Sequence, residues 1–265
     1  TMGVDAIHDF MKPLGFGQIT GLDLPGELRG TLPSTEWKKK TYKKPEQQRW
    51  YGGETISLGI GQGYNAFTML QLANATAVLA NGGTFHKPRL VMATQDPIQR
   101  VDRAVKSDAP VNLGYKPEHV EVIKQGLIGV AKDGTSARVF AGTPYQSAGK
   151  TGTAQAVTIG QKDKYNASKL EEHQRDHALY MAFAPANNPQ IALAIVVENA
   201  GFGAAQAAPI ARRVFDYWLL GDYPSVEDIE ASQKGLASTP IGTRRRKEDI
   251  QLVPSEGVVG GGKNR

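Results

Sequence analysis

Apolar residues recur at helical spacing along residues 66–81, "AFTMLQLANATAVLAN". Thr68 is a residue type that caps helix starts, and Gly82-Gly83 is typical of a helix end. The spacing therefore predicts a helix that is buried along one face. The apolar positions of that face are Leu70, Ala73, Ala77 and Ala80.

Two more stretches show the same period. Residues 117–131 lie before the stop signal Asp133-Gly134 and are predicted as a second helix. Residues 208–222, "APIARRVFDYWLLGD", are predicted as a helix that lies on a sheet. The apolar positions are Val120, Ile123, Leu127, Val130 and Ala131 in the first, and Ile210, Val214, Phe215, Trp218 and Leu219 in the second.

The period changes to that of strands in residues 147–159, 178–185 and 190–199. The turn-forming "PANNP" separates the last two segments, so we predict an antiparallel meander with helices beside it. Residues 55–60, "TISLGI", are also strand-like. The glycines of Gly61-Gln62-Gly63, which follow them, are interpreted as conformational rather than as part of a ligand loop.

The apolar pattern stops at about Pro224. We therefore interpret residues 1–224 as part of one folded domain and residues 225–265 as a disordered basic tail. The longest apolar runs are far shorter than the roughly 18 residues of a membrane helix. The absence of cysteine excludes disulfides and thiolate metal sites.

The chain has a net charge of +5 and a pI of about 9.2. Its basic residues form separate clusters at 37–44 and 244–247, with no nucleic-acid-binding motif beside them. We interpret both clusters as solvated surface charge and expect no nucleic-acid partner.

Residues 147–155, "SAGKTGTAQ", contain a lysine that could belong to a phosphate loop. Such a loop needs a glycine five residues before Gly149, and that position is Pro144. It should also open a helix, whereas "TGTAQAVTI" has strand composition. The alternative is a Lys-Thr-Gly motif on a strand, which serine β-lactamases and penicillin-binding proteins use.

Four further segments accompany this motif: "GFGQITGLDLPGE", "ISLGIGQGYNAFTMLQLANATAVLANGGTFHKPRLV", "DGTSARVF" and "RDHALYMAFAPANNPQIALAIVVEN". With them, residues 1–222 resemble the transpeptidase domain of class B penicillin-binding proteins of the elongation type, penicillin-binding protein 2. The resemblance implies an α+β fold of the penicillin-binding protein and serine β-lactamase kind, here incomplete at its N-terminus. Met69 stands where the family usually has Pro, a change that should leave the helix intact.

The resemblance also implies roles for the motif residues. Thr151 and Thr153 would bind the carboxylate of a D-alanyl-D-alanine stem peptide or of a β-lactam, and Lys150 would contact a serine of the second family motif. Gly152 would leave space for the helix that carries the nucleophile, and the Thr153 amide would form half of an oxyanion hole. Strand alternation agrees, since it places Thr151 and Thr153 on one face and Lys150 and Gly152 on the other.

Two family motifs have no counterpart with the right geometry. The only S-x-x-K is Ser147 to Lys150, which lies on a predicted strand, and no S-x-N or S-x-D occurs. We therefore expect the chain to be a C-terminal fragment, inactive alone, whose nucleophile lies upstream. For the intact parent, the resemblance implies a membrane anchor, a periplasmic location and a membrane glycosyltransferase partner within the elongation machinery.

The activity implied for the parent is peptidoglycan D,D-transpeptidation through a serine acyl-enzyme, without cofactor or metal. Two alternatives stay open. The first is a D,D-carboxypeptidase or β-lactamase of the same superfamily, and the second is a non-catalytic interaction module. His177 is interpreted as structural, because a neutral histidine can satisfy a strand end by hydrogen bonding.

Overall fold

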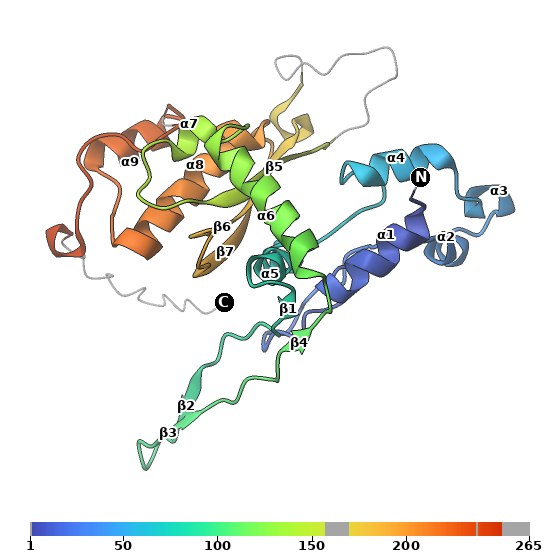
Figure 1. Ribbon diagram of the computed structural model, residues 1–265, viewed down its shortest axis with the longest axis horizontal. Helices are drawn as coiled ribbons and strands as arrows, with labels where there is room; N and C mark the ends of the chain where they lie inside the picture. Colours follow the sequence, from blue (N-terminus) through green and yellow to red (C-terminus); the bar gives the residue numbers. More distant parts are fainter. Residues whose placement is uncertain (1, 157–169, 237, 251–265) are drawn as a thin grey trace, which may run out of the picture.

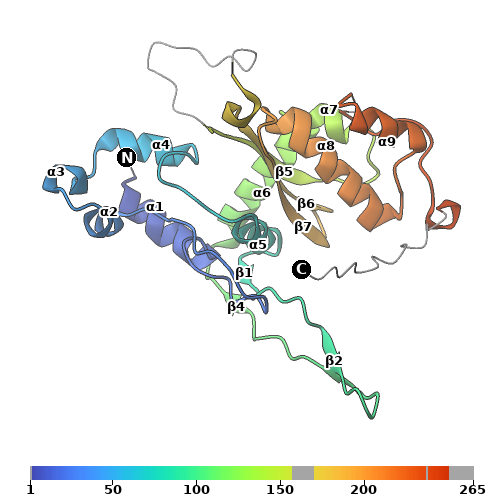
Figure 2. The same ribbon diagram turned by 180° about the vertical axis from the view of Figure 1, so that it is seen from behind.

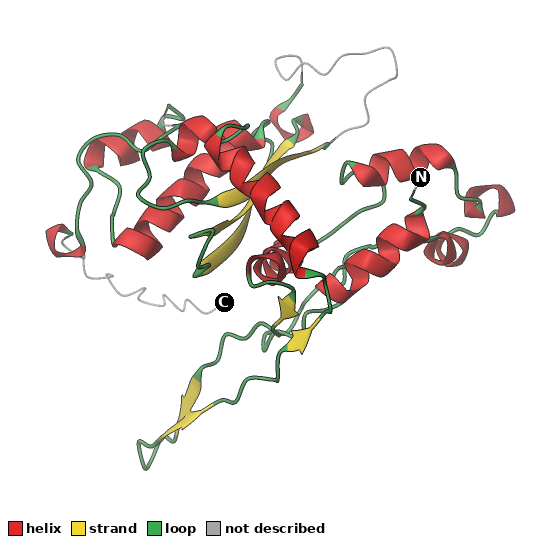
Figure 3. Ribbon diagram, in the orientation of Figure 1, coloured by secondary structure: helices red, strands yellow, loops and turns green. Residues whose placement is uncertain are grey.

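A computed structural model describes residues 2–156, 170–236 and 238–250 of the protein. Its centre is a three-stranded antiparallel sheet in the order β5 (Ala148–Ala154), β6 (His177–Ala184) and β7 (Ile191–Val197). Helices cover both faces of the sheet (Figures 1 and 3). The predicted meander is confirmed over these residues, and the end of the first predicted strand, 157–159, lies outside the described residues.

The register of the sheet sorts its side chains between the two faces. Thr151 pairs with Tyr180, and Gly152 pairs with Leu179. Directly opposed residues of an antiparallel pair point to the same face. Alternate residues of β6 therefore supply two different cores.

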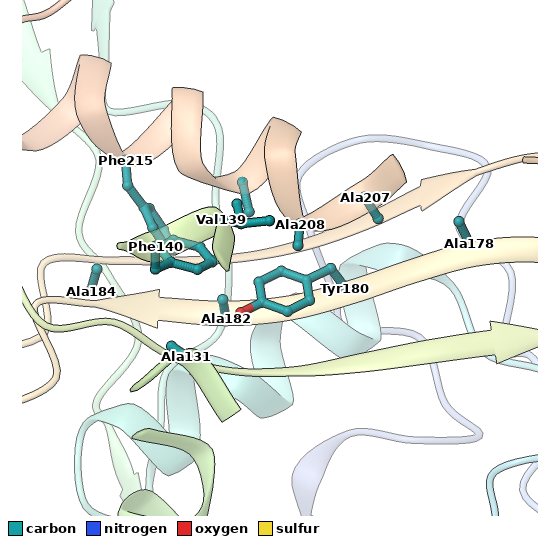
Figure 4. Packing of buried hydrophobic residues seen from close by; sticks show 11 residues of the cluster. Ala131, Val139, Phe140, Ala178, Tyr180, Ala182, Ala184, Ala207, Ala208 and Phe215 are labelled. Carbon is teal, nitrogen blue, oxygen red and sulfur yellow. The ribbon is translucent and has the colours of Figure 1, made fainter. Parts of the chain in front are cut away.

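The first core lies between the sheet and helix α8 (Gly203–Phe215), which continues as one π-helical segment over Asp216–Leu220. Figure 4 shows Phe140, Tyr180 and Phe215 filling the space between them. The rings of Phe140 and Tyr180 are stacked with centroids 6.0 Å apart, and Phe140 comes from the short helix α7 (Ala137–Phe140). Such aromatic packing stabilises the layer beyond simple burial of area.

The buried face of α8 differs from the predicted stripe. Ala207, Ala208 and Ala211 are fully buried together with Phe215, whereas Trp218 is 60% exposed. Ile210 and Val214 also point outward. Small side chains let the helix approach the sheet closely, so Ala rather than the larger apolar residues occupies the interface.

The second core covers the opposite face of the sheet with helices α5 (Met69–Ala80) and α6 (Pro117–Lys132). Both predicted helices are confirmed. Thr68 caps α5 in a reciprocal pair of hydrogen bonds with Gln71, of 3.1 and 3.0 Å, so the helix begins at Met69 without the family's proline. In α6, Ile128 is buried and Ile123 is exposed, contrary to the predicted face.

The predicted buried face of α5 is confirmed at Ala80, whereas Leu70, Ala73 and Ala77 are only half-buried. The buried residues are Gln71, Ala75, Thr76, Val78 and Ala80. Gln71 is accommodated because its side-chain amide donates to the carbonyls of Gln18 at 2.6 Å and Arg29 at 2.8 Å. A polar side chain with its hydrogen bonds satisfied can occupy a core position, and apolar periodicity does not detect it.

Residues 2–64 form a helical N-terminal part. Its elements are α1 (Val4–Met11), η1 (Lys12–Leu14), α2 (Thr35–Thr41), α3 (Pro45–Gln48) and α4 (Gly52–Gly59). Residues 55–60, predicted as strand-like, lie mostly in α4. The helix is held by Glu54, which pairs with the buried Lys38 and accepts from the Tyr64 hydroxyl at 2.9 Å. These long-range contacts outweigh the local strand preference.

Two small sheets connect α5 to α6. Strand β1 (Thr84–Phe85) pairs with β4 (Val111–Asn112), and β2 (Ala93–Gln95) pairs with β3 (Asp102–Ala104). The β2–β3 hairpin projects away from the rest of the molecule in both views (Figures 1 and 2). A short 3₁₀ helix, η3 (Glu172–Gln174), precedes β6.

The predicted disorder from residue 225 does not agree with the structure of residues 225–236 and 238–250. Ser225 caps helix α9 (Val226–Gln233), and a short 3₁₀ helix, η5, spans Lys247–Asp249. The buried Asp228 accepts two hydrogen bonds from Arg213 of α8, at 2.8 and 2.6 Å. The segment is polar, so hydrophobic periodicity missed it, but charged pairs attach it to α8. Residues 251–265 lie outside the described residues.

Candidate functional site

The Lys-Thr-Gly motif lies on β5, which forms one edge of the three-stranded sheet. Thr151 shares its face with Tyr180 and therefore with the α8 core, as does Thr153 with Ala178. Lys150 and Gly152 pair with Met181 and Leu179, on the other face. The predicted arrangement of the four residues on the two faces of a strand is confirmed.

Lys150 is the exposed cation of the motif. Its ammonium donates to the Thr151 carbonyl at 2.8 Å. Ser147, the other end of the formal S-x-x-K match, is 3% exposed and lies just before the strand. Because this match is not on a helix, the two side chains do not have the i, i+3 arrangement of a nucleophile and its lysine.

The Thr151 hydroxyl lies 3.2 Å from the hydroxyl of Thr135, in the loop between α6 and α7. The neighbouring Ser136 is fully buried and lies 3.0 Å from the Tyr180 hydroxyl. Burial raises the pKa of Tyr180 to about 12, so its phenol stays protonated at neutral pH. The Thr151 hydroxyl thus contacts a residue that directly precedes the buried pair of Ser136 and Tyr180.

Glycines allow close packing around the motif. A Cβ atom on Gly203, at the start of α8, would lie 2.1 Å from the Leu179 carbonyl oxygen and 2.6 Å from that of Gly152. A Cβ atom on Gly152 would meet only Leu179, at 3.2 Å, among the described residues within 4 Å. The face of β5 at Gly152 is therefore open in the part of the chain that the structure describes.

The Gly61-Gln62-Gly63 loop reaches the same strand. Gly61 and Gly63 have φ angles of 77° and 73°, which agrees with the predicted conformational role of these glycines. Gln62 also donates from its side-chain amide to the Thr153 carbonyl at 3.3 Å. This contact joins the N-terminal part of the chain to the candidate site.

His177 accepts a hydrogen bond at Nδ1 from the amide of Asn199, at 3.0 Å. The contact joins the start of β6 to the end of β7 and supports the structural interpretation. No cluster of His, Asp and Glu suited to a metal ion occurs in residues 2–156, 170–236 and 238–250. Within the same ranges, no helix is long and apolar enough to cross a membrane.

Sequence reasoning missed Thr135 and Gln62 as neighbours of the motif. Thr135 lies within "DGTSARVF", one of the segments that carries the family resemblance, but neither spacing nor residue type gave it a role. It lies 16 residues before Thr151, and Gln62 lies 91 residues before Thr153. Only the fold brings these pairs together.

A Lys-Thr-Gly strand at a sheet edge, packed against a C-terminal helix, defines the class of protein. The chain belongs to the family of penicillin-binding protein transpeptidase domains, whose model matches residues 1–216.

The curated relatives include peptidoglycan D,D-transpeptidases MrdA. The chain is 41% identical over 242 residues to that of Escherichia coli strain K12, covering 89% of this chain and 36% of the relative. It is 44% identical over 220 residues to that of Acinetobacter baumannii. That match covers 83% of this chain and 32% of the relative. The chain thus spans about a third of the length of these relatives.

Solved structures show the same fold. Pseudomonas aeruginosa PBP2 in complex with WCK 5153 is 40% identical, with a TM-score of 0.66 over 82% of this chain and 43% of that chain. The complex between PBP2 and MreC from Helicobacter pylori is 26% identical, with a TM-score of 0.64. That match covers 83% of this chain and 37% of that chain. The predicted α+β fold and the resemblance to penicillin-binding protein 2 are confirmed.

Proposed function

We propose that this chain supplies the Lys-Thr-Gly strand of a peptidoglycan D,D-transpeptidase whose nucleophilic serine lies outside the sequence given. The observation that carries the proposal is the arrangement of β5. Thr151 and Thr153 lie on one face, Lys150 and Gly152 on the other, and the strand is at an edge. The relatives named D,D-transpeptidase support it.

The proposed reaction is covalent catalysis in two steps. The serine oxygen attacks the carbonyl carbon of the penultimate D-alanine of a donor stem peptide, and the peptide C–N bond breaks. D-alanine leaves with a proton, and an ester remains on the serine. An acceptor amine then attacks this ester, forms a new amide and returns the serine hydroxyl.

Within this reaction, the hydroxyls of Thr151 and Thr153 would donate to the terminal carboxylate of the donor peptide. Lys150 would contact the serine of the second family motif. The backbone amide of Thr153 would stabilise the developing oxyanion, a contribution of about 2.7–4 kcal/mol in enzymes where such a donor was removed. β-Lactams with a carboxylate would occupy the same positions and acylate the same serine.

Location and partners follow from the same resemblance. We propose that the intact protein acts at the periplasmic face of the cytoplasmic membrane, together with a glycosyltransferase of the elongation machinery. One similar solved structure is described as a complex of PBP2 with MreC, and another as a peptidoglycan synthase complex that coordinates polymerization and crosslinking.

The proposed activity can be tested with the full-length gene product. We expect it to label with fluorescent penicillin and to release D-alanine while forming cross-linked peptide dimers in the presence of an acceptor. Hydrolysed donor without dimers would indicate a carboxypeptidase, and rapid turnover of penicillin would indicate a β-lactamase. A parent reading frame without a helical S-x-x-K, or a product that never labels, would favour a non-catalytic module.

A further inference from the structure

The contact between Thr135 and Thr151 places a second hydroxyl beside the motif. The two oxygens are 3.2 Å apart and come from different elements, the loop before α7 and the edge strand β5. Thr135 is exposed and Thr151 is half-buried. Both hydroxyls are therefore accessible at the surface where the strand would meet a substrate.

A buried connection fixes the loop that carries Thr135. Ser136 donates its only hydroxyl hydrogen to the Val130 carbonyl at 3.1 Å. The Tyr180 hydroxyl, 3.0 Å away, must therefore be the donor to Ser136. Both residues are fully buried, so neither hydroxyl can exchange its partner for water without unfolding the loop.

Gly149 makes room for this connection. A Cβ atom at Gly149 would lie 2.5 Å from the Tyr180 hydroxyl oxygen. Any larger residue would push the phenol away from Ser136. The strand that carries the motif thus also determines where the Thr135 loop sits.

The contact between the two threonines can run in either direction, and the two directions leave different hydrogens free. Each hydroxyl has one hydrogen and two acceptor lone pairs. If Thr135 donates to Thr151, the Thr151 hydrogen is free to point away from the protein. A hydroxyl that already accepts a hydrogen bond becomes a stronger donor, because chains of hydrogen bonds polarise one another.

We propose that Thr135 is a positioning residue for the carboxylate of the substrate: its hydroxyl donates to Thr151, which donates to the carboxylate. The inference rests on the proposed function, since it takes Thr151 as the contact of that carboxylate. It adds a residue from the "DGTSARVF" segment to the recognition of the free C-terminus.

The test compares one penicillin with its methyl ester, using the full-length protein. The acid and the ester share the β-lactam ring, and the methyl ester lacks the negative charge that Thr151 would bind. We expect Thr135→Val to slow acylation by the acid about fivefold to tenfold, the size of a lost hydrogen bond between neutral groups, and to leave the ester rate unchanged. Thr135→Ser keeps the hydroxyl and should restore the rate with the acid.

Ser136→Ala and Tyr180→Phe test the buried connection without removing Thr135. Each should lower the ratio of acid to ester rate constants in the same direction as Thr135→Val. Thr94→Val, a β-branched exchange on the exposed strand β2, is the matched control and should leave the ratio unchanged. Melting temperatures of all variants separate lost folding from lost recognition.

Three results would overturn the inference: an unchanged acid rate in Thr135→Val, equal slowing of acid and ester, or no recovery in Thr135→Ser. A wild-type protein that neither compound acylates would contradict the proposed function and, with it, this inference. The wild-type rate with the acid therefore separates the two failures.

Discussion

Lys150 and Thr153 have different expected effects when they are replaced in the full-length protein. Thr153→Val removes a hydroxyl and keeps the β-branched strand shape, so acylation by a carboxylate-bearing β-lactam should slow about tenfold with the fold intact. Under the proposed function, Lys150→Ala would also leave the serine of the second motif without its partner, so we expect acylation to slow about a hundredfold. Acylation rate constants equal to wild type in both variants would refute the assigned roles.

Glycine at position 203 is a packing requirement of α8 on the sheet. Gly203→Ala would place a Cβ atom 2.1 Å from the Leu179 carbonyl oxygen, so the helix would have to move. We expect the free energy of unfolding to fall by about 1–3 kcal/mol, which is typical of overpacking.

Gly126→Ala in α6 is the matched control, because a Cβ atom there meets nothing within 4 Å. It should stabilise the protein by about 0.5–1 kcal/mol, since alanine loses less backbone entropy in a helix. Thermal unfolding of the two variants measures the difference. Equal melting temperatures for Gly203→Ala and Gly126→Ala would show that α8 does not approach the sheet this closely.

At the scale of elements, ion pairs attach the basic run at 244–246 to residues 222–224, which follow α8 and its π-helical segment. Asp222 accepts from Arg244 at 2.9 Å and pairs with Arg246 at 2.8 Å, and Arg245 donates to the Pro224 carbonyl at 2.8 Å. Buried charges are stable only when paired, so loss of one partner should release the segment.

The basic run at 244–247 therefore gives a proteolysis test. The sequence alone predicts that trypsin cuts there first, as expected of a disordered tail. The structure predicts protection of Arg244 and Arg245, and faster cutting in Asp222→Asn. Asp108→Asn, which removes an exposed pair with Lys87, should leave the cutting rate unchanged. Early cutting at 244–246 in the wild type would support the disordered tail instead.

For the whole molecule, the outer edge of β7 decides how the chain behaves alone. Among the described residues, β7 pairs only with β6, and Val196 is 38% exposed. An open, nearly uncharged β-branched edge promotes association with other strands. Phe215 is fully buried, whereas Trp218 is 60% exposed.

We expect this chain, expressed alone, to self-associate and to form no penicillin adduct. Co-expression with the upstream half of the parent should restore solubility, because that half would supply a strand for the β7 edge. Size-exclusion chromatography and fluorescent-penicillin labelling measure both properties. A monomer that labels covalently would contradict the fragment interpretation.

The sequence by itself determined what depends on neighbours along the chain. Helical and strand periods located α5, α6, α8 and the meander, and strand alternation separated Lys150 from Thr151. These features follow from backbone geometry, in which side-chain direction repeats every 3.6 or 2 residues. The motif could therefore be placed on a strand, and its four residues on two faces, before any contact was known.

Only the tertiary structure decided what depends on distant partners. Gln71 is buried because carbonyls of two remote loops accept from it, and residues 55–60 are largely helical because Glu54 meets Lys38. Thr135 contacts Thr151, and the neighbouring Ser136 contacts Tyr180 on the central strand β6. Such contacts join residues far apart in sequence, and the local period carries no information about them, since their energy arises only after the elements have packed.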